Sequence, residues 1–531
     1  MKLILIKVYE IEIKMKFKFK NLGISAWDMA SVVMTDHDAF ILGVKSGDRV
    51  TLSPINKKGE KLDIKVVAVL EIALKSEIIH NEEVGLYDET FKKLIQNLDP
   101  EDKNIEYIDI QISERPITYE YIKAKIKGKS LSTYEIQSII NDVTQDKLIP
   151  IEIAAFITAM EINGATDNEI VDLTLSMTNS GEILKFDREV FDKHSTGGVP
   201  GNKVSLIIVP IIAAAGLFIP KTSTRAITSP SGTADSMEVL ANIAFSREEM
   251  LELLKRTNGA ILWGGALDLA PADNALINIE KPLNMDPFPL MIASILCKKL
   301  AMGVTKMVLD IPCGRGTKFP TIEDGRKFAM RFKSIAKRVG IEVICVLTSA
   351  QQPIGHAVGP ALEAREALRL LQKVFNISTS LLNKSTELAG ILLELGGKAP
   401  EGKGKDLALE ILKSGKAYEE MKKIIKNQGG NPNIQPEDIQ VGPFVQEIFA
   451  TKEGFVTDID NSSINQIAKI AGCPASKTAG IEIEAKIGTK VKNGDIIFRI
   501  YSDSEEKLKK SVEYYYKHPP QILGGMTLEK I

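Results

Sequence analysis

Residues 193–203 read Lys-His-Ser-Thr-Gly-Gly-Val-Pro-Gly-Asn-Lys and directly precede a long apolar helical segment. Glycines let backbone N–H groups turn toward a ligand, and the start of a helix favours anions. The stretch therefore predicts a phosphate cradle between a strand and a helix. It is not a P-loop, because that motif has Gly and then Ser or Thr where this chain has Asn202 and Val204. A tight turn without a ligand is the alternative, and Lys193, Ser195 and Thr196 favour the anion.

The sequence around this loop predicts an α/β layer. Strand-like runs at Met307–Ile311 and Val343–Leu347 alternate with amphipathic helices at Ile322–Val339 and Ala361–Val374. This alternation is typical of a mostly parallel sheet covered by helices. We expect an α/β phosphate-binding domain over residues 181–430.

Three further parts complete the expected multidomain α/β fold. Residues 1–110 predict a β-rich, barrel-like N-terminal domain, with Ala39–Val44 as one of its strands. Residues 115–180 predict a helical domain with a return segment near 270–302, and residues 431–531 predict a C-terminal α+β domain.

Local signals support these parts. Ser132 to Glu135 form a capping-box pattern, and Pro150 begins a second helical period. Charged and apolar residues alternate from Glu10 to Lys20, which predicts a strand and not a signal peptide.

Composition limits the function classes. The 531 residues suit about three to five domains, and 44% hydrophobic with 26% charged residues is typical of globular proteins. Lys and Arg number 67 against 69 Asp and Glu, a formal charge of −2, so no polycationic surface for nucleic acid is expected. Any anion must be bound by a local site.

Cysteine and apolar patterns point to a cytoplasmic protein. The four cysteines form no CxxC pair, so neither a disulfide framework nor a zinc site is predicted: Cys297, Cys313, Cys345 and Cys473. No carboxylates or histidines have metal spacing, and no metal or cofactor is expected. The apolar stretch from Val204 to Ile219 is too short and too interrupted to span a bilayer.

A second cluster of small polar residues runs from Ser223 to Glu238. Hydroxyls, one Arg and a Gly-Thr step ahead of a helix supply donors without bulk, as a sugar phosphate requires. The alternative is a helix cap made by Ser231 or Thr233.

Several long motifs occur in the order found in one enzyme family. KHSTGG, GTADSMEVL, the segment from Asp286 to Gly303 and QPIGHAVGPALEAREAL resemble the thymidine/pyrimidine-nucleoside phosphorylase family over roughly residues 115 to 531. Within it, the chain looks like the archaeal AMP phosphorylase branch, which has an extra N-terminal domain. That resemblance implies phosphorolysis of AMP, with CMP and UMP as further expected substrates, by inorganic phosphate to free base and ribose 1,5-bisphosphate.

The resemblance also implies site residues. The inorganic phosphate ligands would be Lys193, Ser195, Ser205, Ser223 and Thr233. The AMP contacts would be Gly198, Thr224, Arg225, Ala226, Ile227, Thr228, Ser229, Thr233, Ser294, Lys298 and Lys318, with Ser294 and Lys298 on the base. The Arg that pyrimidine phosphorylases place on the base would fall near Ile279, where no Arg stands. The family's glycine-rich second motif is altered at Thr224, Ala226, Ser229, Pro230, Ser231 and Ser236, which fits the nucleotide-using branch.

Asp286 is the expected catalytic acid. Phosphorolysis builds an oxocarbenium-like ribosyl centre while the base leaves with negative charge, so an acid beside the base is needed. The counterpart of Asp286 in the AMP-using branch is the proton donor; the alternative is an ordinary Asp-Pro turn or helix cap. Lys318 follows a strand in a Gly-containing loop, where open α/β sheets bind ligands. No proton-transfer role is assigned to His194 or His356.

Three rivals remain. The altered second motif and the missing Arg near Ile279 argue against a thymidine or uridine phosphorylase. A phosphoribosyltransferase would need acidic Mg²⁺ ligands near the glycine loop. A binding or assembly protein on the same fold would not need the lysines and hydroxyls. Resemblance further implies closure of the helical and α/β domains on the substrates, and a homodimer or larger homo-oligomer.

Overall fold

The chain divides into two compact units. The computed structural model describes residues 16–26, 29–75, 77–96, 98, 105–226, 229–267, 269–372 and 378–525. The first unit consists of Met1–Ala165 with Ala275–Pro287, and the second consists of Thr166–Asn274 with Phe288–Ile531. The boundary at Asn274 falls inside helix α10 (Pro271–Leu283).

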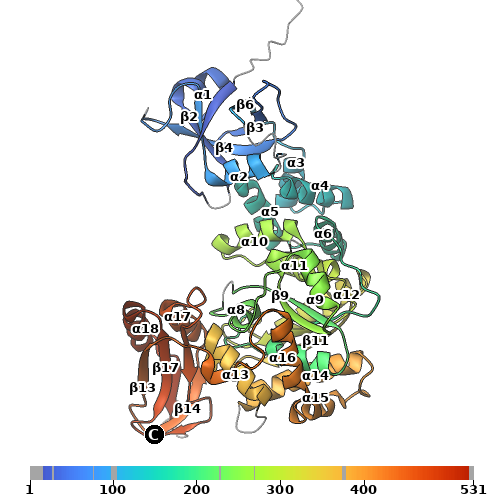
Figure 1. The fold of residues 1–531 in the computed structure, drawn as a ribbon, viewed down its shortest axis with the longest axis vertical. Coiled ribbons are helices and arrows are strands. Elements are labelled where there is room, and N and C mark those ends of the chain that lie inside the picture. Colours follow the sequence, from blue (N-terminus) through green and yellow to red (C-terminus); the bar gives the residue numbers. More distant parts are fainter. Residues whose placement is uncertain are drawn as a thin grey trace, which may run out of the picture. The chain divides into compact units, whose positions relative to one another are not determined.

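A closed barrel forms the N-terminal part of the first unit (Figure 1). Its strand order is β1-β5-β2-β4-β3-β6, and alternate side chains such as Val32, Leu52 and Leu70 fill the interior. The strands are β1 Lys16–Asn21, β2 Ser31–Thr35, β3 Arg49–Ile55, β4 Val66–Ala73, β5 Glu83–Leu86 and β6 Tyr107–Ile112, with helices α1 Asp36–Leu42 and α2 Asp88–Gln96. The barrel-like N-terminal expectation is confirmed, and residues 10–15 of the expected first strand lie outside the described residues.

The expectation of a strand at Ala39–Val44 was wrong. Asp36–Leu42 is helix α1, because the Thr35 hydroxyl accepts a hydrogen bond from the Asp38 backbone N–H at 3.2 Å and starts the helix. Gly43 ends it in the left-handed conformation at φ 71°. The caps at both ends outweigh the strand propensity of the apolar run between them.

Three helices follow the barrel within the first unit: α3 Thr118–Ile126, α4 Thr133–Thr144 and α5 Pro150–Asn163. The predicted capping box is confirmed, since the Ser132 N–H donates to the Glu135 carboxylate at 2.7 Å and the Ser132 hydroxyl accepts from the Glu135 N–H at 3.4 Å. The barrel is tied to α5 by a buried ion pair between Arg49 and Glu152 at 2.6 Å.

The second unit is built on parallel strands. The order β11-β10-β7 is parallel throughout, and β8 pairs with β9 in parallel. A parallel bridge between Val190 and Phe218 joins the two sheets beside β7. The strands are β7 Phe191–Ser195, β8 Ile219–Ser223, β9 Gly259–Trp263, β10 Lys306–Cys313 and β11 Glu342–Ser349. Their carboxyl ends therefore lie at one edge. From β7 the chain adds β8 and β9 on one side of this strand, and it then adds β10 and β11 on the other side, so the strand order changes direction between β7 and β10.

Helices surround these strands. The helices are α6 Asp167–Asn179, α7 Ser205–Ala214, α8 Thr233–Glu238, α9 Arg247–Leu254, α11 Phe288–Ala301, α12 Ile322–Arg338, α13 Pro360–Gln372, α14 Thr379–Leu395, α15 Gly404–Lys413 and α16 Lys416–Asn427. Helix α7 is buried on all sides from Ser205 to Ala213, which explains its unbroken apolar sequence. The predicted alternation of strands and amphipathic helices is confirmed, and residues 373–374 of the last predicted helix lie outside the described residues.

The C-terminal part of the second unit is mostly antiparallel. One sheet has the order β12-β15-β17-β13 and the other has β16-β14-β18. The elements are β12 Ala357–Val358, β13 Phe444–Phe449, β14 Gly454–Ile459, α17 Asn461–Ala471, β15 Gly480–Ile483, β16 Lys490–Val491, β17 Ile496–Ser502, α18 Glu505–Lys517 and β18 Gln521–Gly524. β12 pairs with β15, so the loop before α13 is bonded to the C-terminal sheet.

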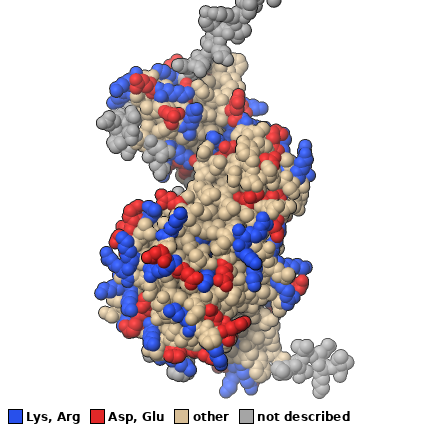
Figure 2. Space-filling view, turned by 90° about the vertical axis from the view of Figure 1, so that its right-hand side faces the viewer, with Lys and Arg blue, Asp and Glu red and all other residues tan. Residues whose placement is uncertain are grey.

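Surface charge is mixed on the face that Figure 2 shows. Blue and red side chains are interspersed there, as the formal charge of −2 leads one to expect. Among the described residues, no helix combines the length and the apolar character that crossing a membrane requires.

The Arg49–Glu152 pair should carry much of the contact between the barrel and α5. Arg49→Met leaves a buried carboxylate without its cation, and we expect a loss of about 3–5 kcal/mol in the stability of the first unit. The control is Lys92→Met, which removes an exposed pair with Asp88 and should cost at most about 0.5 kcal/mol. Hydrogen exchange of the β3 amides, followed by mass spectrometry, measures the loss of stability in both variants. Equal protection of these amides in the two variants would contradict the prediction.

Candidate active site

The carboxyl edge of the parallel sheet collects the predicted polar residues. Lys193 and Ser195 lie on β7, Ser223 ends β8, and Ser205 and Thr233 are the first residues of α7 and α8. The loop between β7 and α7 turns through left-handed glycines, with φ of 85° at Gly197, 90° at Gly198 and 72° at Gly201. Only glycine takes these conformations without strain, which explains the glycine pattern of residues 193–203.

Two loops meet at the carboxyl ends of β7 and β10, between which the strand order changes direction. A Cβ atom on Gly198 would lie 3.1 Å from the Thr317 Cα and 3.2 Å from the Lys318 backbone N. The β7–α7 loop therefore packs directly on the loop after β10, and a side chain at position 198 would push them apart. In open α/β sheets, ligands bind outside the carboxyl ends of the strands at the point where the strand order changes direction.

The loop after β7 is held from within by Asn202. Its side-chain NH₂ donates to the Ser195 hydroxyl at 3.0 Å and to the Asp310 carboxylate at 3.3 Å. The Gly197 N–H also donates to the Ser195 hydroxyl at 3.4 Å. In the part of the chain that the structure describes, the buried Thr196 hydroxyl has no hydrogen-bond partner. The loop thus offers a fixed Ser195 and a spare donor at Thr196.

Beneath the loop, two lysines flank one aspartate. Lys193 Nζ lies 3.6 Å and Lys384 Nζ lies 3.0 Å from Asp310 Oδ2, and all three side chains are buried. Burial lowers the pKa of Lys193 to about 8, against the attraction of Asp310. Burial also opposes ionisation of Asp310, but Lys384 and Lys193 outweigh it and hold the pKa of Asp310 well below its usual value.

A second group of the same composition is built on Asp192, the residue before Lys193 on β7. Lys221 Nζ is 3.5 Å from Asp192 Oδ1, and Lys299 Nζ is 2.5 Å from Asp192 Oδ2. Burial lowers the pKa of Lys221 to about 7. Each group has two lysines for one carboxylate, so the first group carries an excess positive charge below about pH 8 and the second below about pH 7. Such a surplus is compensated when an anion binds.

Sequence reasoning missed most of these charged residues: Asp192, Lys221, Lys299, Asp310 and Lys384. A signal was present, because Asp310 interrupts the otherwise apolar strand β10 and Asp192 precedes Lys193 on β7. A charge in a buried strand is seldom tolerated without a partner.

His194, which is half-buried, lies close to these lysines. Burial, with the positive charges of Lys299 and Lys221, holds the pKa of His194 well below its usual value. The imidazole is therefore neutral near pH 7 in this structure.

The second cluster is organised around Asp235. Its carboxylate accepts hydrogen bonds from the Ala226 N–H at 2.7 Å and the Gly232 N–H at 3.0 Å, which fixes the loop before α8. The alternative of Ser231 or Thr233 as the helix cap was wrong, because Gly232 is the N-cap and Asp235 supplies the acceptor.

Arg225 is already engaged within this cluster. Its guanidinium pairs with Glu238 at 2.5 Å and Asp235 at 3.5 Å and lies 4.7 Å from the Trp263 ring centre. Thr224 and Ser229 lie in the same loop and are partly or fully exposed. Ile227 and Thr228, two of the predicted AMP contacts, lie outside the described residues.

Helix α11 brings the remaining predicted contacts together. Ser294 and Lys298 lie one turn apart on it, and Lys298 Nζ forms an ion pair with Asp273 at 2.6 Å. Lys318 Nζ lies 3.4 Å from the Met291 sulfur on the same helix. Ser223, by contrast, donates its hydroxyl hydrogen to the Leu262 carbonyl at 2.9 Å.

Asp286 belongs to the first compact unit, in the short segment between α10 and α11. The contacts described above all lie within the second unit. The assignment of Asp286 as the acid stays a prediction, as do the ligand roles of the other predicted residues.

Metal ligands are not grouped in the part of the chain that the structure describes. No three His, Cys, Asp or Glu side chains there are placed to bind one metal ion. The four cysteines are free thiols, and Cys297, Cys313 and Cys473 are buried.

Three known protein families match the chain. Residues 119–181 match the glycosyl transferase family helical bundle domain, and residues 187–418 match the glycosyl transferase family a/b domain. Residues 455–518 match the pyrimidine nucleoside phosphorylase C-terminal domain. A crystal structure of anthranilate phosphoribosyltransferase from Thermus thermophilus superposes with a TM-score of 0.48 at 21% identity, over 58% of this chain and 98% of that one.

Curated relatives match over nearly the whole length. AMP phosphorylase from Methanosarcina acetivorans is 44% identical over 93% of this chain and 94% of its own. AMP phosphorylase from Methanocaldococcus jannaschii is 45% identical over 86% and 89%, and that from Methanococcus maripaludis is 46% identical over 80% and 84%. Identity at this level over most of both chains shows that the chain belongs to the AMP phosphorylase family.

Proposed function

We propose that the protein is a pentosyltransferase that cleaves AMP with inorganic phosphate into adenine and ribose 1,5-bisphosphate, with CMP and UMP as further substrates. The observation that carries this proposal is the surplus of buried positive charge directly under a glycine loop. The Lys193–Asp310–Lys384 group, which Asn202 joins to this loop and which has one lysine in excess, suits an anionic co-substrate that must be desolvated before it reacts. The relatives named AMP phosphorylase support the identity of the nucleotide.

The expected ligands divide between two anions. Inorganic phosphate would contact the hydroxyl and ammonium groups of Lys193, Ser195, Ser205, Ser223 and Thr233. AMP would contact Gly198, the segment from Thr224 to Ser229, Thr233, Ser294, Lys298 and Lys318. Lys318 is the candidate for the 5′-phosphate, because its loop packs on Gly198 at the carboxyl ends of β7 and β10, between which the strand order changes direction.

The residues suit the chemistry of phosphorolysis. A fixed phosphate oxygen attacks C1′ of the ribose as the glycosidic bond breaks, and the leaving base nitrogen takes a proton. Asp286 would donate that proton from a protonated carboxyl group. A closure of the helical and α/β domains would keep water from the oxocarbenium-like centre.

The remaining expectations complete the proposal. Phosphate is a co-substrate, and no cofactor is required. The enzyme acts in the cytoplasm as a homodimer or larger homo-oligomer. Its domains extend over residues 1–110, 115–180 with a return near 270–302, 181–430 and 431–531.

Product analysis tests the reaction directly. Incubation with AMP and phosphate should release adenine and ribose 1,5-bisphosphate in equal amounts, and omission of phosphate should stop it. Adenosine, thymidine and uridine serve as controls, because they lack the 5′-phosphate. Cleavage of these nucleosides alone would establish the nucleoside phosphorylase alternative instead.

Phosphate binding should weaken above about pH 8. The pKa of Lys193 is lowered to about 8, so its ammonium charge is present below that pH and is lost as pH rises through it. The KM for phosphate should therefore rise above pH 8, by at most about tenfold per pH unit. Initial rates from about pH 7.5 to about pH 9.5 measure this rise in KM.

Lys193→Arg is the matched control, because a guanidinium stays protonated, and its KM for phosphate should not rise above pH 8. A rise of equal size in both proteins would contradict the assignment.

Asp286→Asn tests the acid. The amide has nearly the same shape but no acidic proton, so kcat for adenine release should fall by about 10²-fold or more while KM for phosphate changes little. Steady-state kinetics with AMP give both constants. An unchanged kcat would remove Asp286 from the mechanism.

A further inference from the structure

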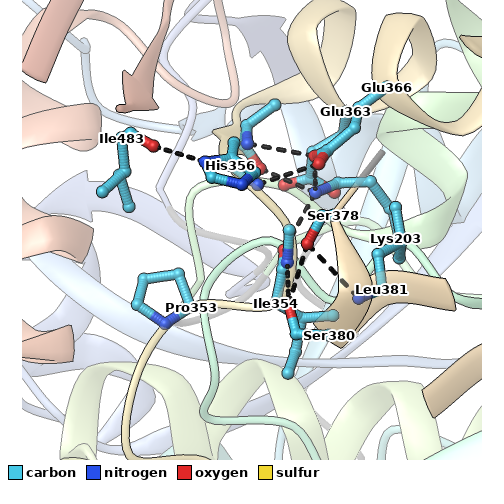
Figure 3. Close-up of polar contacts among 12 residues, drawn as sticks. Lys203, Pro353, Ile354, His356, Glu363, Glu366, Ser378, Ser380, Leu381 and Ile483 are labelled. Carbon is cyan, nitrogen blue, oxygen red and sulfur yellow. Dashed lines mark hydrogen bonds and ion pairs between the residues drawn. The ribbon is translucent and has the colours of Figure 1, made fainter. Parts of the chain in front are cut away.

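The far end of the phosphate-binding loop is fixed by one buried lysine. Lys203 Nζ donates to the carbonyls of Ile354 at 3.0 Å and Ala357 at 2.8 Å and forms an ion pair with Glu366 at 2.6 Å (Figure 3). Its side chain has no exposed surface. All three donor hydrogens of the ammonium group are thus used inside the protein, and none remains for a substrate. Lys203 closes the 193–203 loop without being a ligand.

The loop of residues 352–357, which we call the brace loop, lies in direct contact with the phosphate-binding loop. The Ile354 N–H donates to the Pro200 carbonyl at 3.0 Å. A Cβ atom on Gly201 would lie 2.5 Å from the Ile354 carbonyl oxygen. Any shift of the brace loop therefore moves Gly201 and, with it, the turn that carries Gly197 and Gly198.

Helix α13 holds the brace loop from one side. The Glu366 carboxylate accepts the N–H groups of His356 at 2.9 Å and Ala357 at 3.0 Å besides pairing with Lys203. Burial opposes ionisation of Glu366, but Lys203 and these donors hold its pKa below the usual value. The charge that anchors Lys203 is therefore maintained near neutral pH.

The C-terminal part holds the brace loop from the other side. Lys486 Nζ donates to the carbonyls of Gly355, at 2.8 Å, and Pro353. The Ile487 N–H donates to the Gln352 side-chain oxygen at 3.0 Å. Figure 3 shows His356 pointing toward Ile483, whose carbonyl oxygen lies 2.6 Å from the His356 Nδ1.

The same C-terminal part reaches the second cluster. Lys477 Nζ forms ion pairs with Asp235 at 2.8 Å and Glu238 at 2.9 Å, the two carboxylates that hold Arg225. Within the second unit, residues between Lys477 and Ile487 are therefore bonded directly to the second cluster, and to the 193–203 loop only through the brace loop.

We propose that Lys486, acting through the brace loop and Lys203, is a positioning residue that sets the affinity of the 193–203 loop for phosphate. The physical reason is preorganisation: a glycine-rich loop loses conformational freedom when it binds an anion, and a loop already fixed at both ends loses less. The inference rests on the proposed function for the identity of the anion. It adds that the C-terminal part contributes to phosphate binding from behind the loop, without touching phosphate.

The test compares two lysines of the C-terminal part. Lys486→Met keeps the alkyl chain but removes the donors to the brace loop, and we expect KM for phosphate to rise about fivefold to tenfold while KM for AMP and kcat change less than twofold. Lys490→Met is the matched control, because Lys490 is exposed and pairs only with Glu453 among the ion pairs of the described residues. Lys486→Arg, which keeps charge and donors, should recover at least part of the affinity.

A readout without turnover separates the inference from the proposed function. Inorganic phosphate should raise the melting temperature of each protein, and the phosphate dissociation constant obtained from that rise should be larger in Lys486→Met than in Lys490→Met or the unmodified protein. Gln352→Ala, a milder change at the same contact, should shift it in the same direction by a smaller factor. Stabilisation by phosphate without AMP cleavage would contradict the proposed function and leave the positioning role intact.

Two results would overturn the positioning role. One is a phosphate dissociation constant, obtained from the melting temperatures, that in both Lys486→Met and Gln352→Ala lies within twofold of the value for the unmodified protein. The other is an equal rise in KM for phosphate and AMP together with a lower melting temperature, since that pattern indicates a general loss of stability. A KM rise confined to phosphate, recovered by Lys486→Arg, supports it.

Discussion

Buried positive charge is the constraint on which the site depends. A lysine removed from water is costly unless a carboxylate accompanies it, and the cost grows as exposure falls. The chain meets this requirement with Asp192, Asp310 and Glu366, each beside one or two buried lysines. Glu366 balances Lys203 one to one and yields a structural junction. Asp310 leaves one of its two lysines uncompensated, and this difference separates the end of the loop that can hold an anion from the end that Lys203 fixes.

The parallel sheet explains why these groups meet. Strands β7, β8 and β10 run in the same direction, so residues distant in sequence reach one edge of the sheet. The strand order changes direction between β7 and β10, and the loops that follow these two strands therefore lie side by side. Gly198 is required there because a Cβ atom at this position would lie 3.1 Å from the Thr317 Cα. The antiparallel C-terminal sheets then add a second support, because β15 pairs with β12 directly before α13. Geometry and charge thus converge on the same loop.

Much of this arrangement was predictable from sequence. The glycine spacing of residues 193–203, the alternation of strands and helices, and the capping box at Ser132 have local causes, and local patterns suffice for them. The helix at Asp36–Leu42 was missed because two caps, and not periodicity, decide it. The partners of Lys193 and Lys203 were not predictable, since Asp310, Lys384 and Glu366 lie more than a hundred residues away and meet them only through sheet order. The ligand roles came from family resemblance and not from spacing.

The central claim is that the loop of residues 193–203 holds inorganic phosphate over the surplus charge of the Lys193–Asp310–Lys384 group. A crystal structure of the full chain soaked with tungstate, an electron-dense phosphate analogue, tests it most directly. The account predicts one strong peak within hydrogen-bonding distance of Ser195 and the first turn of α7, with Lys193 as the nearest cation and Lys203 still bonded to Glu366. A peak at another place with this loop empty, or a Lys203 that leaves Glu366 to bind the anion, would contradict it.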